Sequence, residues 1–81
     1  MEDFRPQNSV GNSVKRLRKS LKLTQNDLAA RCGVQGWDIS ENTITKIEKG
    51  IRCITDKELI LLARALQVKL QDIFSDYRDL V

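Results

Sequence analysis

The middle of the chain, between Thr24 and Gly50, has the pattern of two short helices joined by a turn: TQNDLAARCGVQGWDISENTITKIEKG. Thr24 with Asp27 three residues later is an acidic variant of a capping box, and Ser40 can cap the second helix. That second helix would turn its isoleucines inward and leave its polar side chains outside. This is the layout of a helix that enters a DNA groove.

One further helix is predicted before this pair. Asn12 or Ser13 can cap it, and its apolar residues then recur at i, i+3 and i+7, namely Val14, Leu17 and Leu21. Pro6, within DFRPQNS, marks the preceding residues as irregular. We therefore expect residues 1–11 to form a flexible leader.

Two more helices are predicted after the pair. Thr55 with Glu58 is a full capping box, and the helix behind it has a wide apolar stripe of Leu59, Ile60, Leu62, Ala63 and Leu66. A short fifth helix fits LQDIF, whose Leu70, Ile73 and Phe74 would pack back. The predicted fold is all-α and compact, with one domain over residues 12–74 and a short C-terminal tail over residues 75–81.

The charge of the chain is unevenly distributed. Lys and Arg number 14 against 11 acids, a formal net charge of +3. No acid lies between Asp3 and Asp27, whereas six bases do: Arg5, Lys15, Arg16, Arg18, Lys19 and Lys22. Such a lopsided potential is typical of a protein that turns one face toward a polyanion.

Composition argues against several other classes of function. The chain has no His, no Gly-rich phosphate loop and no C-x-x-C, so we expect no enzyme, no metal and no cofactor. Cys32 and Cys53 lie among apolar neighbours and are expected to be buried free thiols. MEDFRPQNSV is unlike a signal peptide, and no apolar run approaches the roughly 20 residues of a membrane span, so we expect a cytoplasmic protein.

From Val14 to Phe74 the sequence resembles the helix-turn-helix domain of the phage lambda repressor and Cro proteins and of the bacterial xenobiotic-response-element-type regulators. The resemblance rests on three segments in the right order: LRKSLKLTQNDLA, ITKIEKG and ELILLARALQVKLQDIF. It implies a five-helix lambda-repressor-like domain in a sequence-specific DNA-binding transcription regulator. Its second and third helices would form the helix-turn-helix.

The resemblance implies a set of residues that read bases. Glu41, Asn42 and Lys46 match the family positions that meet base edges in the major groove. Asn suits adenine, Lys suits guanine, and Glu can accept from cytosine N4. For Glu41 an equal alternative remains open, because a carboxylate beside Ser40 also stabilises a helix N-terminus.

The resemblance also implies residues that meet the DNA backbone. Gln25 matches a glutamine that binds a phosphate and braces the recognition helix, and with Thr24 it lies at a helix N-terminus, which suits an anion. Its alternative is an ordinary first-turn polar residue. Thr43 and Thr45 would touch phosphates or a thymine methyl. The full set of backbone candidates is Thr24, Gln25, Ser40, Thr43, Thr45, Lys49 and Arg52, with a solvated loop charge as the alternative for Lys49.

Two further features concern the scaffold. Arg18 and Glu48 match a pair that forms a buried salt bridge in the family. The turn VQGWDI is longer than in most relatives, and Gly33 before it is expected to supply the left-handed end of its helix. Trp37 in that turn either folds back as an apolar lid with Ile39 or contacts the DNA backbone or a partner subunit.

The resemblance further implies a repressor that acts as a homodimer on an inverted repeat, with two recognition helices about 34 Å apart. Apolar residues that the core does not use are the candidates for the dimer interface: Ile54, Leu61, Tyr77, Leu80 and Val81. The alternative is an antitoxin-type module that binds a protein partner and regulates its own gene through DNA.

Overall fold

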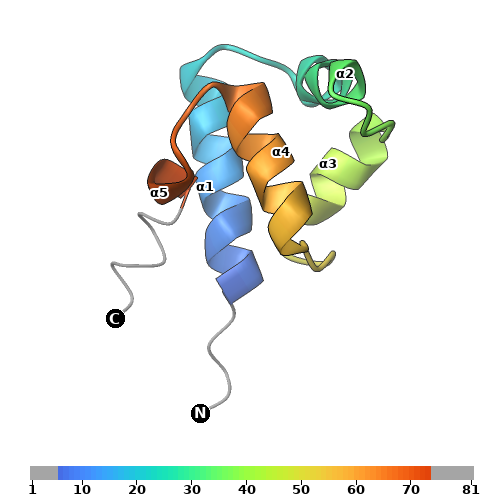
Figure 1. The fold of residues 1–81 in the computed structure, drawn as a ribbon. Coiled ribbons are helices and arrows are strands. Elements are labelled where there is room, and N and C mark those ends of the chain that lie inside the picture. Colours follow the sequence, from blue (N-terminus) through green and yellow to red (C-terminus); the bar gives the residue numbers. More distant parts are fainter. Residues whose placement is uncertain (1–5, 74–81) are drawn as a thin grey trace.

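A computed structural model describes residues 6–73 of the chain, which form five α-helices (Figure 1). The helices are α1 (Pro6–Ser20), α2 (Gln25–Val34), α3 (Glu41–Glu48), α4 (Asp56–Leu66) and α5 (Leu70–Ile73). Helices α1 and α4 lie side by side, α2 and α3 pack together on one side of them, and the short α5 packs against α1 on the other (Figure 1). The predicted all-α, five-helix fold is confirmed.

The first helix begins earlier than predicted. It starts at Pro6 and not near Asn12, because a proline at the first helical position has its ring torsion preset for the helix and lacks an N–H that would be unpaired there anyway. Neither Asn12 nor Ser13 caps it, since both lie inside the helix, Asn12 exposed and Ser13 buried. Residues 6–11 therefore belong to α1, and the expectation of a flexible leader fails for them.

The added turns of α1 carry a close helix contact. Val10 and Gly11 are buried, and a Cβ placed on Gly11 would collide with the carbonyl oxygen of Ile47 and lie 2.9 Å from that of Glu48. A glycine here lets the backbone of α1 approach the last turn of α3. This contact fixes the end of α3 against α1.

The core lies where all four long helices meet. The largest fully buried apolar side chains are Leu28, Ile44, Ile47, Leu62, Leu66, Ile73, Val14 and Cys32. Three residues predicted to be buried are instead 40–44% exposed: Leu21, Ile60 and Leu70. Leu21 falls beyond the end of α1, and Ile60 lies on the outward side of α4, while Ala65 takes a buried place that the sequence analysis did not assign.

The helix caps and turns agree with the predictions made from the sequence, except at Gly33. Both capping boxes form, Thr24 with Asp27 and Thr55 with Glu58. Gly33, however, does not end α2 in a left-handed conformation. The helix continues to Val34, and Gly36 takes the positive φ of +90° that starts the chain back toward α3.

The two cysteines have different surroundings. Cys32 is fully buried, and burial raises the pKa of its thiol to about 11 because the charged thiolate would lose its water. Cys53 is exposed, so the prediction of a buried thiol is wrong there. It lies in the loop between α3 and α4, where its apolar sequence neighbours do not cover it. Both cysteines are free.

Several predictions fall outside the described residues. Phe74, the tail over residues 75–81 and the interface candidates Tyr77, Leu80 and Val81 all lie there.

Among residues 6–73 no helix is long and apolar enough to cross a bilayer. Over the same residues no cluster of three or more His, Cys, Asp or Glu side chains could hold a metal ion.

Candidate nucleic-acid interface

Helix α3 presents the three predicted base readers to solvent. Glu41, Asn42 and Lys46 are all exposed, whereas Ile44 and Ile47 are fully buried beneath them. Asn42 and Lys46 are four residues apart and therefore share one face of the helix. Glu41 lies in the first turn, where its carboxylate is also placed to interact favourably with the helix N-terminus.

The hydroxyl groups of α3 make hydrogen bonds within the protein. Ser40 Oγ accepts from the Thr43 backbone N–H at 3.3 Å and caps the helix, and its hydroxyl lies 3.3 Å from that of Thr43. Thr45 Oγ1 donates to Gln25 Oε1 at 2.8 Å and lies 3.2 Å from the Glu41 carbonyl oxygen. Thr45 thus links α3 to the start of α2.

A buried network holds α3 in its place. Arg18 donates twice to the Glu48 carboxylate, from Nε to Oε2 at 2.7 Å and from Nη2 to Oε1 at 3.1 Å, and both residues are no more than 7% exposed. Gln25 Nε2 adds a third donor to Glu48 Oε1 at 3.0 Å. Arg18 Nη1 also donates to the Leu23 carbonyl at 2.7 Å. The last turn of α3 is therefore tied to both α1 and the start of α2.

Gln25 is engaged at both ends of its side-chain amide. Its oxygen accepts from Thr45 and its nitrogen donates to Glu48, which leaves one N–H of the NH₂ group for another acceptor. The capping box uses the backbone N–H groups of Thr24 and Asp27, whereas helix geometry leaves those of Gln25 and Asn26 without an intrahelical acceptor. This corner can receive an anion while α3 remains braced.

The loop after α3 folds back onto the end of that helix. The backbone N–H groups of Ile51 and Arg52 donate to the Lys46 carbonyl at 3.0 and 3.3 Å. The Arg52 guanidinium then pairs with both Glu58 oxygens at 3.1 Å and lies 5.9 Å from the centre of the Trp37 ring. The hydrogen bonds from Arg52 are the main reason that the pKa of the Glu58 carboxyl lies below its usual value.

Trp37 behaves as an apolar lid in the structure. It is partly buried and packs with Ile39 against the core. This agrees with the first of the two interpretations of the long turn. Nothing in the sequence indicated that the Arg52 side chain also lies beside the Trp37 ring. Glu58 was assigned only to a capping box, since no local sequence signal connects it with Arg52 across the loop.

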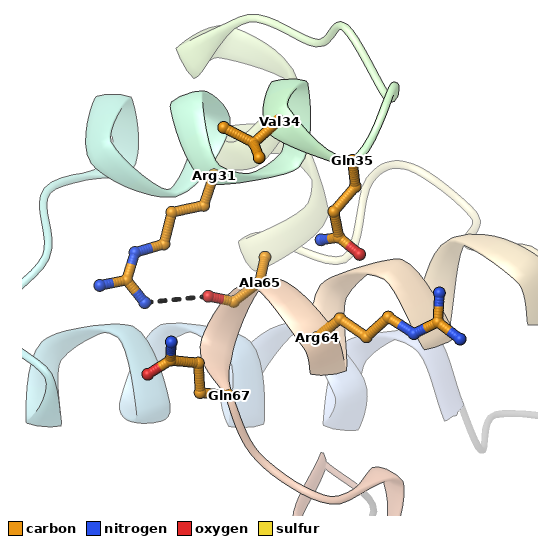
Figure 2. Close-up of a pocket in the computed structure, with 6 residues that line it drawn as sticks. All are labelled: Arg31, Val34, Gln35, Arg64, Ala65 and Gln67. Atoms are coloured by element: carbon orange, nitrogen blue, oxygen red, sulfur yellow. Dashed lines mark hydrogen bonds between the residues drawn. The ribbon is translucent and has the colours of Figure 1, made fainter.

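A separate cleft of about 440 Å³ opens between the C-terminal ends of α2 and α4 (Figure 2). Arg31 Nη1 reaches across it to the Ala65 carbonyl at 3.0 Å, and Arg64 points away from that contact (Figure 2). Gln35 Nε2 donates to the Leu61 carbonyl at 2.9 Å nearby. These two bonds attach α2 to α4. Neither was predicted, because both join side chains to carbonyls far along the chain.

The sequence model of the helix-turn-helix family matches residues 14–73, from the middle of α1 to the end of α5. The chain belongs to the Cro/C1-type helix-turn-helix family. It is a DNA-binding transcriptional regulator of this type.

One solved structure has a fold similar to that of this helix-turn-helix protein. The crystal structure of the restriction-modification controller protein C.AhdI from Aeromonas hydrophila matches with a TM-score of 0.78 at 22% sequence identity. The match covers 91% of this chain and 100% of that one. No curated protein sequence matches.

Proposed function

We propose that this helix-turn-helix protein is a sequence-specific repressor that acts as a homodimer on an inverted-repeat operator in double-stranded DNA, with α3 in the major groove. The observation that carries the proposal is the division of polar side chains on α3. Thr45 and Glu48 are used inside the protein, while Asn42 and Lys46 are exposed on one face and free to meet base edges. Such a protein acts in the cytoplasm, where its DNA lies.

Base reading is assigned to the exposed side chains of α3. Asn42 would make a bidentate contact to adenine and Lys46 would donate to guanine, whereas Glu41 would accept from cytosine. The bracing of α3 by Arg18 and Gln25 supports these roles, because a rigidly held helix keeps its side chains in register with the bases.

Contacts with the DNA backbone are assigned to the two ends of α3 and the start of α2. Gln25 offers a backbone N–H at the N-terminus of α2, beside the N-cap Thr24, and Ser40 and Thr43 lie at the start of α3. Lys49 and Arg52 supply positive charge beyond its end. Thr45 is the weakest of the backbone candidates, since its hydroxyl already donates to Gln25.

The dimer contact is assigned to the surface around the start of α4. Ile54 and Leu61 are half-buried, Ile54 against the core, whereas Ile51 in the preceding loop and Ile60 on α4 are 68% and 44% exposed. Apolar side chains that are exposed to water in the monomer favour an interface between two copies of the chain. We expect a concentration-dependent dimer in sedimentation. A monomer at high concentration, both free and on DNA, would remove the homodimer from the proposal.

Selection of bound sequences from a random duplex pool tests the function directly. We expect an enriched inverted repeat whose affinity falls steeply as salt rises. Lys46→Ala should relax the sequence preference at one position of each half-site, at a cost of about 1 to 3 kcal/mol. Lys15→Ala is the matched control, because this exposed lysine of α1 should at most weaken binding to all sequences alike. Salt-sensitive binding without any enrichment would overturn sequence-specific recognition.

Glu41 needs its own variant. If its carboxylate reads cytosine, Glu41→Gln should change the selected sequence, since an amide can also donate to a base. If only the overall affinity changes, Glu41 serves the helix N-terminus and leaves the set of base readers.

A further inference from the structure

Arg52 lies where the lengthened turn and the loop after α3 meet. Trp37 approaches it from the turn between α2 and α3, with the guanidinium carbon 5.9 Å from the ring centre. Glu58 approaches from the first turn of α4 and accepts from Nη1 and Nη2 at 3.1 Å. One long cationic side chain is thus held from two directions.

The way Arg52 is held leaves one edge of its guanidinium open. Glu58 occupies the edge formed by the two Nη atoms, and the Trp37 ring lies within cation–π distance. Among residues 6–73 Nε has no hydrogen-bond acceptor, and the Arg52 side chain is 34% exposed. The edge formed by Nε and Nη2 therefore remains available for a second bidentate partner, and a phosphate has the matching geometry.

The backbone places this side chain beside the recognition helix. The N–H groups of Ile51 and Arg52 are bonded to the carbonyl of Lys46, which lies on the exposed face of α3. A strand phosphate next to a groove occupied by α3 would lie near this loop, and the exposed Lys49 adds positive charge to the same place. A pre-oriented arginine gives up less conformational freedom when it binds.

We propose that Trp37 is a positioning residue, which holds the Arg52 guanidinium for contact with a DNA phosphate at the edge of the major groove. The inference rests on the proposed function and gives the long turn a role in DNA affinity. Trp37 acts through Arg52 and makes no contact with DNA itself. Glu58 fixes the far edge of the guanidinium and remains part of the capping box of α4.

A double-mutant cycle tests the coupling between the two side chains. Affinity for the selected duplex is measured at one fixed salt concentration for the wild-type chain, Trp37→Leu, Arg52→Ala and the double variant. With Arg52 present, Trp37→Leu should weaken binding measurably, by up to about five-fold, because an exposed cation–π contact can favour the binding orientation of the guanidinium by no more than its own strength. In the Arg52→Ala background the same change should have no effect. Arg52→Ala alone should lower the slope of log affinity against log salt by about 1.

Trp37→Phe provides a milder second variant, because it keeps an aromatic ring against the core. It should bind between the wild-type chain and Trp37→Leu when Arg52 is present, and equally with them in the Arg52→Ala background. If Trp37→Leu does not fold, as judged by circular dichroism, the cycle with Trp37→Phe decides alone. The control is Lys49→Ala, whose effect on affinity should add to that of the Trp37 variants without coupling.

Three results overturn the inference alone. Equal losses with and without Arg52 would mean that Trp37 touches DNA or supports the fold in general. Tighter binding by Trp37→Leu would mean that the ring keeps Arg52 away from phosphate. Unchanged affinity in both variants of Trp37 would mean that the ring has no part in binding. A wild-type chain that binds no duplex at all overturns the proposed function, and this inference with it.

Discussion

The hydrogen bonds within the protein divide the polar residues of α3 into two groups. Thr45 and Glu48 donate to or accept from side chains of other helices, so their identity is set by the packing of the domain. Asn42 and Lys46 are exposed and can change without loss of the fold. Under the proposed function, sequence preference would vary at these two positions while the network below them stays intact.

Ser13 is a buried residue whose hydroxyl is not used. It is fully buried inside α1, and its Oγ has no hydrogen-bond partner within the described part of the chain. A buried polar group without a partner costs about 1 to 3 kcal/mol. Ser13→Ala should therefore raise the free energy of unfolding by about 1 kcal/mol in urea titrations. Ser20→Ala, which removes an exposed hydroxyl bonded to the Leu17 carbonyl, should change it by at most about 0.5 kcal/mol. A loss of stability in Ser13→Ala would contradict this account.

The two thiols should differ in their reactivity. Cys53 is exposed, whereas Cys32 is fully buried with the pKa of its thiol raised to about 11. At neutral pH a thiol reagent should label one group rapidly in the native protein and the second only after unfolding. Cys53→Ser should remove the fast phase and leave the slow one. Two fast groups in the native wild-type chain would show that Cys32 is not enclosed by the core.

At the scale of elements, the crossing of α1 and α3 depends on one missing side chain. A methyl group on Gly11 would meet backbone carbonyls of α3 and has no flexible neighbour that could give way. The approach brings α1 close to the residue that Arg18 holds, since Glu48 carries one of those carbonyls. Close packing and the ion pair thus secure the same end of α3.

Gly11 and Gly33 form a matched pair for testing this contact. Gly11→Ala should lower the free energy of unfolding by about 1 to 3 kcal/mol, because overpacking outweighs the better helix propensity of alanine. Gly33 lies in α2 with nothing within 4 Å of an added Cβ, and its φ is not positive. Gly33→Ala should therefore raise stability by about 0.5 to 1 kcal/mol. Thermal unfolding of the two variants tests this contact. Equal shifts in their melting temperatures would show that α1 and α3 are not in contact at Gly11.

Local signals in the sequence were enough to predict most of the elements. The capping boxes at Thr24 and Thr55 are formed by residues three apart, so their chemistry can be read from the chain alone. Pro6 was ambiguous, because proline can break a helix or begin one. Gly33 could have supplied the left-handed end of α2, and only the course of the backbone shows that Gly36 takes the positive φ instead.

The candidate surface was predictable where one helix face defines it, and not where distant segments meet. Asn42 and Lys46 could be placed outside from the spacing of Ile44 and Ile47. The exposure of Cys53 and Ile60 depends on which neighbours cover them. The group of Trp37, Arg52 and Glu58 joins a turn, a loop and a helix, and no periodicity within any of these segments indicates that they meet.

At the scale of the whole molecule, the carboxylate of Glu48 joins three helices. It accepts from Arg18 of α1 and Gln25 of α2 while it belongs to α3. Removing one member of a buried ion pair leaves the other charge without compensation and costs about 3 to 5 kcal/mol. That is a large part of the 5 to 15 kcal/mol that stabilises a typical small domain.

Glu48→Ala should therefore lower the free energy of unfolding by about 3 to 5 kcal/mol, with a melting temperature far below that of the wild-type chain. Glu48→Gln should lose less, since it keeps the volume and an acceptor for Arg18. Glu41→Ala provides the control on the same helix, because its exposed carboxylate should contribute at most a few tenths of a kcal/mol. Unchanged melting in Glu48→Ala would refute a structural role for the pair.

The dependence of stability on pH should be confined to the acid side. The chain has no His, so few groups titrate between about pH 6 and 8 and the free energy of unfolding should be nearly constant there. The pKa of Asp27 is lowered chiefly by the hydrogen bond from the Thr24 backbone, and that of Glu58 chiefly by Arg52. A carboxyl whose pKa is lower in the folded state stabilises the fold above its unfolded pKa, about 4, and this contribution is lost as pH falls through the folded pKa.

Urea titrations between pH 7 and pH 2 should therefore show a midpoint that falls only below about pH 4. The double variant Asp27→Asn, Glu58→Gln removes both carboxyl groups while keeping side chains that can accept at the same caps. It should be less stable than the wild-type chain at pH 7, and the difference between the two should shrink as the pH approaches 2. Measuring both chains in parallel cancels the repulsion that a rising net positive charge adds to each. A difference that stays constant down to pH 2 would show that these two carboxylates do not contribute to stability through their charge.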